Sequence, residues 1–208
     1  MNFNQFKKEI NSIKLKELGG LVAHFKLAPQ LRLKYNQEKI EASNPRKAAV
    51  LSLFYPNDKN ETCFLLTQRA SYKGIHSAQI SFPGGKIEKA DTNLQQTALR
   101  ETFEEVGVLQ TSIHIIRELT DVYIPPSNFL ATPFMAFMDE KPSFKPNFEV
   151  ENTMDVLVSD LLNDQNISSV NMTTSYMKNI EVPCFKLNDA IIWGATAMML
   201  AEIKNLLK

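Results

Sequence analysis

Three glutamates and one arginine stand close together in a run whose spacing could support metal chemistry: Arg100, Glu101, Glu104 and Glu105. On a helix, residues three and four positions apart share a face, so the three carboxylates are predicted to project together from an exposed surface. Hard oxygen ligands of this kind suit Mg²⁺ or Mn²⁺, which neutralise phosphate charge and activate water. The run therefore predicts a metal site, although a solvated acidic helix face is the simpler interpretation of the run alone.

A glycine turn lies ahead of this run, at residues 82–86, with the sequence Phe-Pro-Gly-Gly-Lys. Glycine lets the backbone approach a ligand closely and adopt unusual dihedral angles. The backbone carbonyl of Gly85 could thereby join the metal shell. By themselves the two glycines indicate only a tight turn, but a tight turn followed by an acidic helix favours a site for both metal and phosphate.

The elements that would position these residues follow from the hydrophobic pattern. Residues 48–54 and 63–67 read as strands, and the polar residues 56–60 between them favour a turn, so we predict a β-hairpin. A helix is predicted from about Asn93 to Val106, with Gly107 ending it.

Further elements flank these. We predict strands at residues 111–122 and 132–138, a helix at residues 195–207, and either a strand or a helix at residues 155–162. Strands mixed with a few helices predict an α+β fold or an α/β/α sandwich in one domain.

The N-terminal segment has a helical pattern of its own. Four apolar residues recur at steps of three and four: Phe3, Phe6, Ile10 and Ile13. Gly19-Gly20 is predicted to end this helix, which we expect to pack on the body of the protein or on a partner chain. We therefore divide the chain into an N-terminal amphipathic helix and linker, residues 1–40, and a main domain, residues 41–208.

The glycine turn and the acidic run resemble the signature of the Nudix hydrolases. That signature is Gly, five residues, Glu, seven residues, Arg-Glu, an apolar residue, any residue, Glu-Glu, any residue, Gly, apolar. The matching positions are Gly85, Arg100, Glu101, Glu104, Glu105, Gly107 and Val108. Asp91 replaces the first Glu, one extra residue separates it from Arg100, and Thr102 replaces an apolar residue. The resemblance implies a Nudix α/β/α sandwich with a mixed sheet, and hydrolysis of a diphosphate bond with Mg²⁺ or Mn²⁺.

The surrounding segments resemble one branch of that family, the coenzyme A diphosphatases. The similar segments are residues 45–51, 65–69, 76–85, 127–129, 147–150 and 192–197. Gly74 stands where the branch usually has a second Arg, and Ala78 replaces a glycine. The resemblance implies cleavage of coenzyme A or acyl-CoA into 4′-phosphopantetheine, or its acyl form, and adenosine 3′,5′-bisphosphate. The alternatives are a Nudix hydrolase of ADP-ribose or another nucleoside diphosphate derivative, and a catalytically silent nucleotide-binding domain that regulates a partner.

Four residues near the glycine turn are the expected substrate-binding set: Arg69, Lys73, His76 and Gln79. Arg69 and Lys73 could bind phosphate groups, Arg69 through its bidentate fork; simple surface charge is the alternative. A structural hydrogen bond is the alternative role for His76.

The expected catalytic set is Arg100, Glu101, Glu104 and Glu149, and the expected metal ligands are Gly85, Glu101, Glu104 and Glu105. Arg100 would pair with a neighbouring carboxylate and fix its rotamer. Glu149 would orient or deprotonate the attacking water or hold another metal ion; an exposed loop residue is the alternative. Trp193 is expected in the core rather than as a platform for substrate.

Composition narrows the classes of partner. Basic and acidic residues balance at 23 each, so nothing points to nucleic acid or a membrane surface. Cys63 and Cys184 form no CxxC pair, which argues against a zinc site or a disulfide framework and favours free buried thiols. The N-terminal residues lack the apolar core of a signal peptide, and no apolar run could span a bilayer, so we expect a cytoplasmic protein. The expected partner is a small CoA-like diphosphate, and a homodimer is left open.

Overall fold

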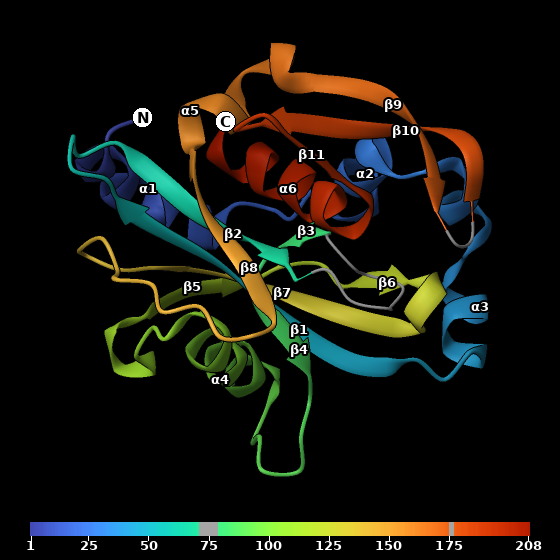
Figure 1. The fold of residues 1–208 in the computed structure, drawn as a ribbon, viewed down its shortest axis with the longest axis horizontal. Helices are drawn as coiled ribbons and strands as arrows, with labels where there is room; N and C mark the ends of the chain where they lie inside the picture. The colour runs from blue at the N-terminus through green and yellow to red at the C-terminus, as the bar shows by residue number, and fades with distance from the viewer. Residues whose placement is uncertain (71–78, 175–176) are drawn as a thin grey trace.

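The computed structural model describes residues 1–70, 79–174 and 177–208 (Figure 1). Its α-helices are α1 (Phe3–Leu15), α2 (Gly20–His24), α3 (Gln37–Ala42), α4 (Leu94–Val106), α5 (Val158–Leu162) and α6 (Gly194–Leu207). Its strands are β1 (Arg46–Pro56), β2 (Thr62–Arg69), β3 (Ile80–Ser81), β4 (Gly84–Lys86), β5 (His114–Glu118), β6 (Val122–Ile124), β7 (Phe129–Phe137), β8 (Val150–Leu157), β9 (Ile167–Thr174), β10 (Met177–Leu187) and β11 (Ala190–Trp193). Short 3₁₀ turns are η1 (Phe25–Leu27), η2 (Gln30–Lys34), η3 (Gln110–Ser112), η4 (Pro125–Ser127) and η5 (Asp164–Asn166).

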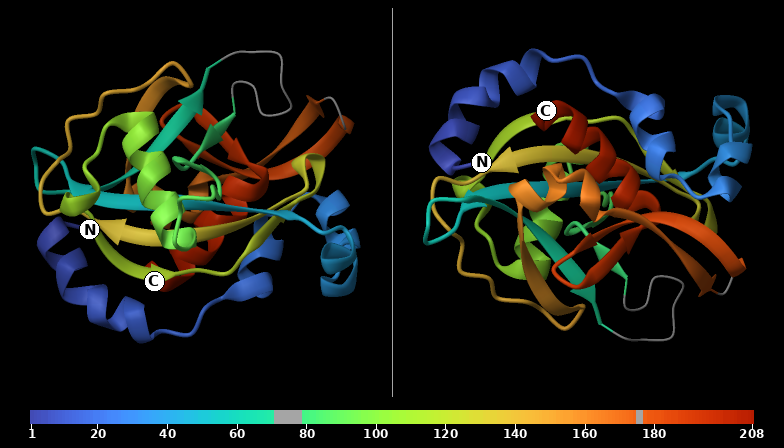
Figure 2. Two further views of the ribbon diagram at one scale, coloured as in Figure 1. Left: turned by 90° about the horizontal axis from the view of Figure 1, so that it is seen from below. Right: turned by 90° about the horizontal axis from the view of Figure 1, so that it is seen from above.

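A mixed sheet forms the middle layer. β1 pairs in parallel with β7 and antiparallel with β2 and β4, and the sheet extends through β3 and β8 on one side and through β5 and β6 on the other. A second, antiparallel sheet has the order β11-β10-β9. α4 covers one face of the mixed sheet, while α1, α6 and the second sheet lie on the other (Figures 1 and 2). The α+β sandwich with a mixed sheet is therefore confirmed.

β1 is buried on both faces because its side chains alternate between two hydrophobic clusters. Leu51 and Leu53 pack in the cluster that includes Ala98 of α4, whereas Phe54 belongs to the cluster on the opposite face. The ring of Phe54 stacks on Phe6 of α1 at 5.1 Å between centroids. Burying each such large side chain contributes roughly 1.5–3 kcal/mol. The predicted hairpin of β1 and β2 is confirmed.

The predicted strand at residues 111–122 is wrong as a single element. The chain forms the turn η3, then β5, then β6, and these two strands pair with different stretches of β7. The register slips between Ile115 and Arg117. The break between β5 and β6 falls at residues 119–121, where the amide of Thr120 donates to the carboxylate of Glu202 on α6, and the apolar pattern of the sequence carries no signal for such a contact.

The segment at residues 155–162, predicted as either a strand or a helix, is a strand followed by a helix, because β8 ends at Leu157 and α5 begins at Val158.

The hairpin of β9 and β10 was not predicted. β9 alternates between exposed and half-buried positions and contains no fully buried residue. A strand of this kind lacks the strong apolar alternation by which strands are recognised.

The N-terminal helix packs on the body of the protein through the four predicted apolar residues, all of which are buried. It ends at Leu15, earlier than predicted, and Gly20 begins α2 instead of ending α1. Leu15 is exposed and lies off the apolar stripe, so the helix gains no burial from continuing.

Cys63 and Cys184 are buried and unpaired, as expected. Among the described helices, none is long and apolar enough to cross a bilayer.

A buried carboxylate on α6 holds the segment that follows α1. The side chain of Glu202 is fully buried and accepts hydrogen bonds from the Gly20 amide at 2.7 Å and from the Thr120 amide at 3.0 Å. The Thr120 hydroxyl donates at 2.7 Å, and Nε2 of His24 lies 3.4 Å from the carboxylate. Burial alone would raise the pKa of Glu202, but His24, Thr120 and the two amides lower it to about 2. Glu202 thus ties α2 and the β5–β6 connection to α6.

We expect Glu202→Gln to lower the free energy of unfolding at pH 7. The pKa of Glu202 is about 2 in the folded protein and about 4.3 in an unfolded chain, a difference worth about 3 kcal/mol. Because the folded-state pKa is depressed, this contribution is complete above about pH 4.3 and is lost as the pH falls toward 2. Urea unfolding of wild type and variant should give a difference that roughly halves between pH 7 and about pH 3. The exposed Glu9→Gln is the control, and a difference that does not change with pH would contradict the assignment.

Candidate active site

The acidic helix α4 begins and ends where the sequence predicts. The side chain of Asn93 caps it by accepting from the amide of Gln96 at 2.8 Å, and Gly107 ends it with φ +73°. Ala98 and Val106 bury one face of the helix against the sheet. Glu101 and Glu105 of α4 project instead toward the glycine turn.

The two glycines of the turn permit two close approaches. At Gly84, where φ is +153°, an added Cβ would collide with the carbonyl oxygen of Ala49 on β1. At Gly85, an added Cβ would lie 2.5 Å from the carboxylate of Glu101. The missing side chains therefore let β4 pack on β1 and let the carboxylate of Glu101 rest on the backbone of Gly85.

Arg100 organises the carboxylates around it. Its guanidinium forms a bidentate pair with Asp91, at 2.9 and 3.0 Å, and its Nη1 contacts Glu101 and Glu104, each at 3.0 Å. Its Nη2 also donates to the carbonyl oxygen of Lys86 at 3.1 Å. These hydrogen bonds hold the pKa of the Asp91 carboxyl well below its usual range and raise the pKa of Arg100.

Glu105 is buried beside the glycine turn, and the residue is only 5% exposed. The expectation that the three glutamates share an exposed face is therefore wrong for Glu105. Its carboxylate accepts from the amide of Gly84 at 3.2 Å. Burial raises the pKa of Glu105 to about 7, against the opposing effects of Arg69 and that amide, and the charges of Glu101 and Glu149 add to the rise. Burial also raises the pKa of Glu101. Negative charge is therefore crowded and poorly solvated here.

The carboxylates do not converge on one point. Within the described ranges, no group of three or more His, Cys, Asp or Glu side chains is placed to hold a metal ion. Glu101 and Glu104 turn toward Arg100, and Glu105 turns toward Gly84. The donor chemistry nevertheless fits a divalent cation, since the hard carboxylate oxygens of Glu101 and Glu105 lie beside the backbone of the glycine turn. The assignment of Gly85, Glu101, Glu104 and Glu105 as ligands stays a prediction.

Arg69 and Glu149 face each other at the edge of this cluster. Nη2 of Arg69 lies 3.2 Å from Oε2 of Glu149, whose side chain is 43% exposed. The expected phosphate-binding cation and the expected water-activating carboxylate therefore neutralise each other in this structure. Gln79 lies next to Arg69, with which it shares a backbone hydrogen bond of 3.0 Å. Lys73 and His76 lie outside the described residues.

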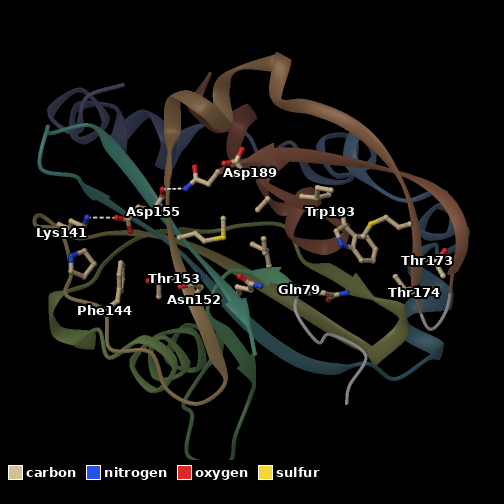
Figure 3. Close-up of a pocket in the computed structure, with 18 residues that line it drawn as sticks. Gln79, Lys141, Phe144, Asn152, Thr153, Asp155, Thr173, Thr174, Asp189 and Trp193 are labelled. Atoms are coloured by element: carbon tan, nitrogen blue, oxygen red, sulfur yellow. Dashed lines mark hydrogen bonds and ion pairs between the residues drawn. The ribbon is translucent and has the colours of Figure 1, made fainter. Parts of the chain in front are cut away.

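A cavity of ≈200 Å³, here called the turn cavity, adjoins the glycine turn. Its walls include Arg69, Gln79, Gly85, Trp193 and Thr196. A larger hollow of ≈1230 Å³, the outer cavity, lies between β8 and the second sheet and also includes Gln79 and Trp193 (Figure 3). The turn cavity thus joins the candidate site to a much larger open space.

Two residues contribute more to the site than their types and spacing predict. Asp91 is the main partner of Arg100, and its place at the first glutamate position of the signature was the signal for that role. Trp193 was expected in the core, which is wrong, because it is only partly buried and lines both cavities. The β11–α6 junction turns it toward the cavities, and a lone aromatic residue in a sequence carries no sign of such a turn.

Comparison with known proteins identifies the family. A profile of the NUDIX domain matches residues 45–166. Nudix hydrolase 22, chloroplastic, from Arabidopsis thaliana is 30% identical over 75% of this chain and 53% of its own length. The uncharacterized Nudix hydrolase NudL of Yersinia pestis (strain Pestoides F) is 27% identical over 78% of this chain and 79% of its own length. The chain spans about half the length of the Arabidopsis protein.

Among solved structures, a MutT/nudix family protein from Enterococcus faecalis superposes with a TM-score of 0.53, over 84% of this chain and 70% of that one. The sequence identity is 14%, so this likeness bears on the fold alone. The NUDIX profile covers the hairpin, the glycine turn and α4, which together carry the candidate site. This chain belongs to the Nudix family.

Proposed function

We propose that this protein hydrolyses the diphosphate bond of coenzyme A or acyl-CoA, using Mg²⁺ or Mn²⁺. The products are 4′-phosphopantetheine, or its acyl form, and adenosine 3′,5′-bisphosphate. The observation that carries the proposal is that the carboxylates of Glu101 and Glu105 lie against the backbone of Gly85 and Gly84, and that both glycines line the turn cavity. Nudix proteins typically act with a divalent metal ion, and this donor set suits one.

The choice of coenzyme A rests on three residues that come from separate segments of the sequence. Arg69, Gln79 and Trp193 belong to three of the six stretches that resemble the coenzyme A diphosphatases, and all three residues line the turn cavity beside Gly85. The outer cavity of ≈1230 Å³ offers room for a long substituent on the diphosphate. These features support a large CoA-like substrate over a bare nucleoside diphosphate.

In the proposed reaction, a water oxygen forms a bond to one phosphorus while that phosphorus loses its bond to the bridging oxygen. The leaving phosphate takes the electron pair, and Glu149 accepts the proton of the water. Mg²⁺ or Mn²⁺ held by Glu101, Glu104 and Glu105 would supply charge neutralisation at the phosphate oxygens. Arg100 orients Glu101 and Glu104, and Arg69 exchanges its contact with Glu149 for a substrate phosphate oxygen.

We expect Glu105→Gln to lower kcat by about 100-fold or more, since losing even an outer-shell partner of a metal site typically costs 10–100-fold. In EDTA the same variant should be more stable than wild type above pH 7. The folded-state pKa of Glu105 is raised to about 7, so the stability that this carboxyl contributes is present below about pH 4.3 and lost as the pH rises through 7. The expected gain at pH 8 is about 1–3 kcal/mol.

Steady-state kinetics at saturating Mg²⁺ and thermal unfolding at about pH 5 and 8 measure the two effects of Glu105→Gln. Glu140→Gln, an exposed carboxylate outside the cluster, is the matched control. Wild-type turnover by Glu105→Gln would show that α4 does not form the metal site. Equal stability of variant and wild type at both pH values would show that the buried carboxylate of Glu105 does not destabilise the metal-free protein.

We expect a higher kcat/KM for coenzyme A or an acyl-CoA than for ADP-ribose, because the cavity-lining segments resemble the coenzyme A branch. The measurement is mass analysis of products and initial rates with coenzyme A, acetyl-CoA, ADP-ribose and NADH, each with Mg²⁺ or Mn²⁺. A kcat/KM for ADP-ribose well above every CoA species would overturn the substrate and leave diphosphate hydrolysis standing. No hydrolysis of any diphosphate would favour a silent nucleotide-binding domain.

A further inference from the structure

A third cavity, of ≈570 Å³, lies between residues 29–39 and the start of α6. We call it the arginine cavity, because Arg32 lines it together with Lys34 and Lys39. Among the described residues, no aspartate or glutamate lines it. The charged side chains that line this cavity are therefore all positive, whereas those of the cluster on α4 are mainly carboxylates.

Arg32 is buried without the partners that a buried guanidinium needs. The residue is 5% exposed, and its Nε and Nη1 atoms have no hydrogen-bond partner in the part of the chain that the structure describes. Its nearest aromatic neighbours are Tyr123 and Tyr35, whose ring centroids lie 5.3 and 6.0 Å from the guanidinium carbon. Burial lowers the pKa of Arg32, yet arginine remains charged in proteins. A buried, unpaired charge is costly, and an anion in the cavity would offset that cost.

The N-terminus of α6 opens on the same cavity. α6 is 14 residues long, and no described side chain caps its first turn. Gly194 has φ +63°, and a Cβ built on it would meet no atom within 4 Å. Uncapped amides and the positive end of the helix dipole therefore face open space beside Arg32.

The arginine cavity continues from the candidate active site. It shares Ile124, Trp193, Gly194 and Ala195 with the turn cavity, whose lining also includes Gly84, Gly85 and Arg69. A substrate whose diphosphate lies at the glycine turn can therefore extend past Trp193 toward Arg32. Lys39 also lines the arginine cavity, and its ammonium group donates a hydrogen bond to the carbonyl oxygen of Lys34 at 3.2 Å.

We propose that the arginine cavity binds a phosphate monoester of the substrate, separate from the diphosphate that is cleaved. Arg32, the first turn of α6 and the lysines at positions 34 and 39 would hold it. The 3′-phosphate of coenzyme A is such a group. This inference rests on the proposed diphosphate hydrolysis, and it places the recognition of the additional phosphate in the N-terminal segment that precedes the NUDIX match.

Binding can be measured without turnover. Trp193 is the single tryptophan of the sequence and lines the arginine cavity, so its fluorescence reports ligands there. The probes are adenosine 3′,5′-bisphosphate and AMP, which differ by the 3′-phosphate, titrated in EDTA at constant ionic strength. We expect Arg32→Gln to weaken the bisphosphate about 10- to 100-fold and to leave AMP nearly unchanged. Arg32→Lys should recover part of the loss, because it restores the charge but not the planar fork.

The exposed pair Lys34→Ala/Lys39→Ala tests the same cavity without disturbing the buried arginine, and Lys59→Ala, in the β1–β2 turn, is the matched control. The lysine pair should selectively weaken the bisphosphate, and Lys59→Ala should weaken neither probe. Equal weakening of both probes by the cavity variants, or no weakening at all, would overturn the proposal. If Arg32→Gln does not fold, the result with the lysine pair decides.

Kinetics on coenzyme A and dephospho-CoA then test whether the phosphate belongs to the substrate. Arg32→Gln should raise KM about 10- to 100-fold for coenzyme A only, with kcat unchanged. The same assays are repeated with added inorganic phosphate. If phosphate alters the wild-type rates on both substrates and has no effect on Arg32→Gln, the cavity binds a free anion, and the assignment of the site to the substrate is overturned. If neither substrate is cleaved, the proposed function fails, while the fluorescence titrations still decide the binding site.

Discussion

Arg100 places one guanidinium against three carboxylates and a backbone carbonyl, and the candidate active site depends on that arrangement. Asp91 fixes the guanidinium through a bidentate pair, and the guanidinium in turn holds Glu101 and Glu104. Without this counter-charge, the carboxylates on one face of α4 would repel one another. The carbonyl of Lys86 ties the same group to β4, so the helix and the glycine turn are positioned together.

Among the contacts of the described residues, Arg100 pairs with Glu101 and Glu104 but not with Glu105, so it does not neutralise the charge of Glu105. Glu105 is buried beside the turn, with the Gly84 amide as its hydrogen-bond donor. Burial is the main cause of its raised pKa, and the charges of Glu101 and Glu149 add to the rise. The proposed metal site therefore adjoins the glycine turn, whose backbone also lines the turn cavity. Trp193 links that backbone to the arginine cavity, whose charge has the opposite sign.

The N-terminal segment contributes to this arrangement although the family resemblance stops short of it. Glu202 anchors α2 to α6, and the chain then passes through η2, where Arg32 turns inward beneath two tyrosines. The aromatic residues of α1 belong to the same hydrophobic cluster as α6. The division at residue 40 stays a prediction about domain organisation, and the packing shows that both parts share one core.

The sequence alone determined the features that depend on neighbours along the chain. The start of α4 near Asn93, the glycine after α4 and the hairpin of β1 and β2 are local, and each formed where its pattern predicts. Thr102, an exception to the family pattern, satisfies its hydroxyl within the helix through the carbonyl of Ala98. Only the tertiary structure decided the burial of Glu105, the pairing of Arg69 with Glu149, and the position of Trp193. These depend on contacts between segments distant in sequence, and burial and charge at such contacts follow from three-dimensional packing rather than from residue spacing.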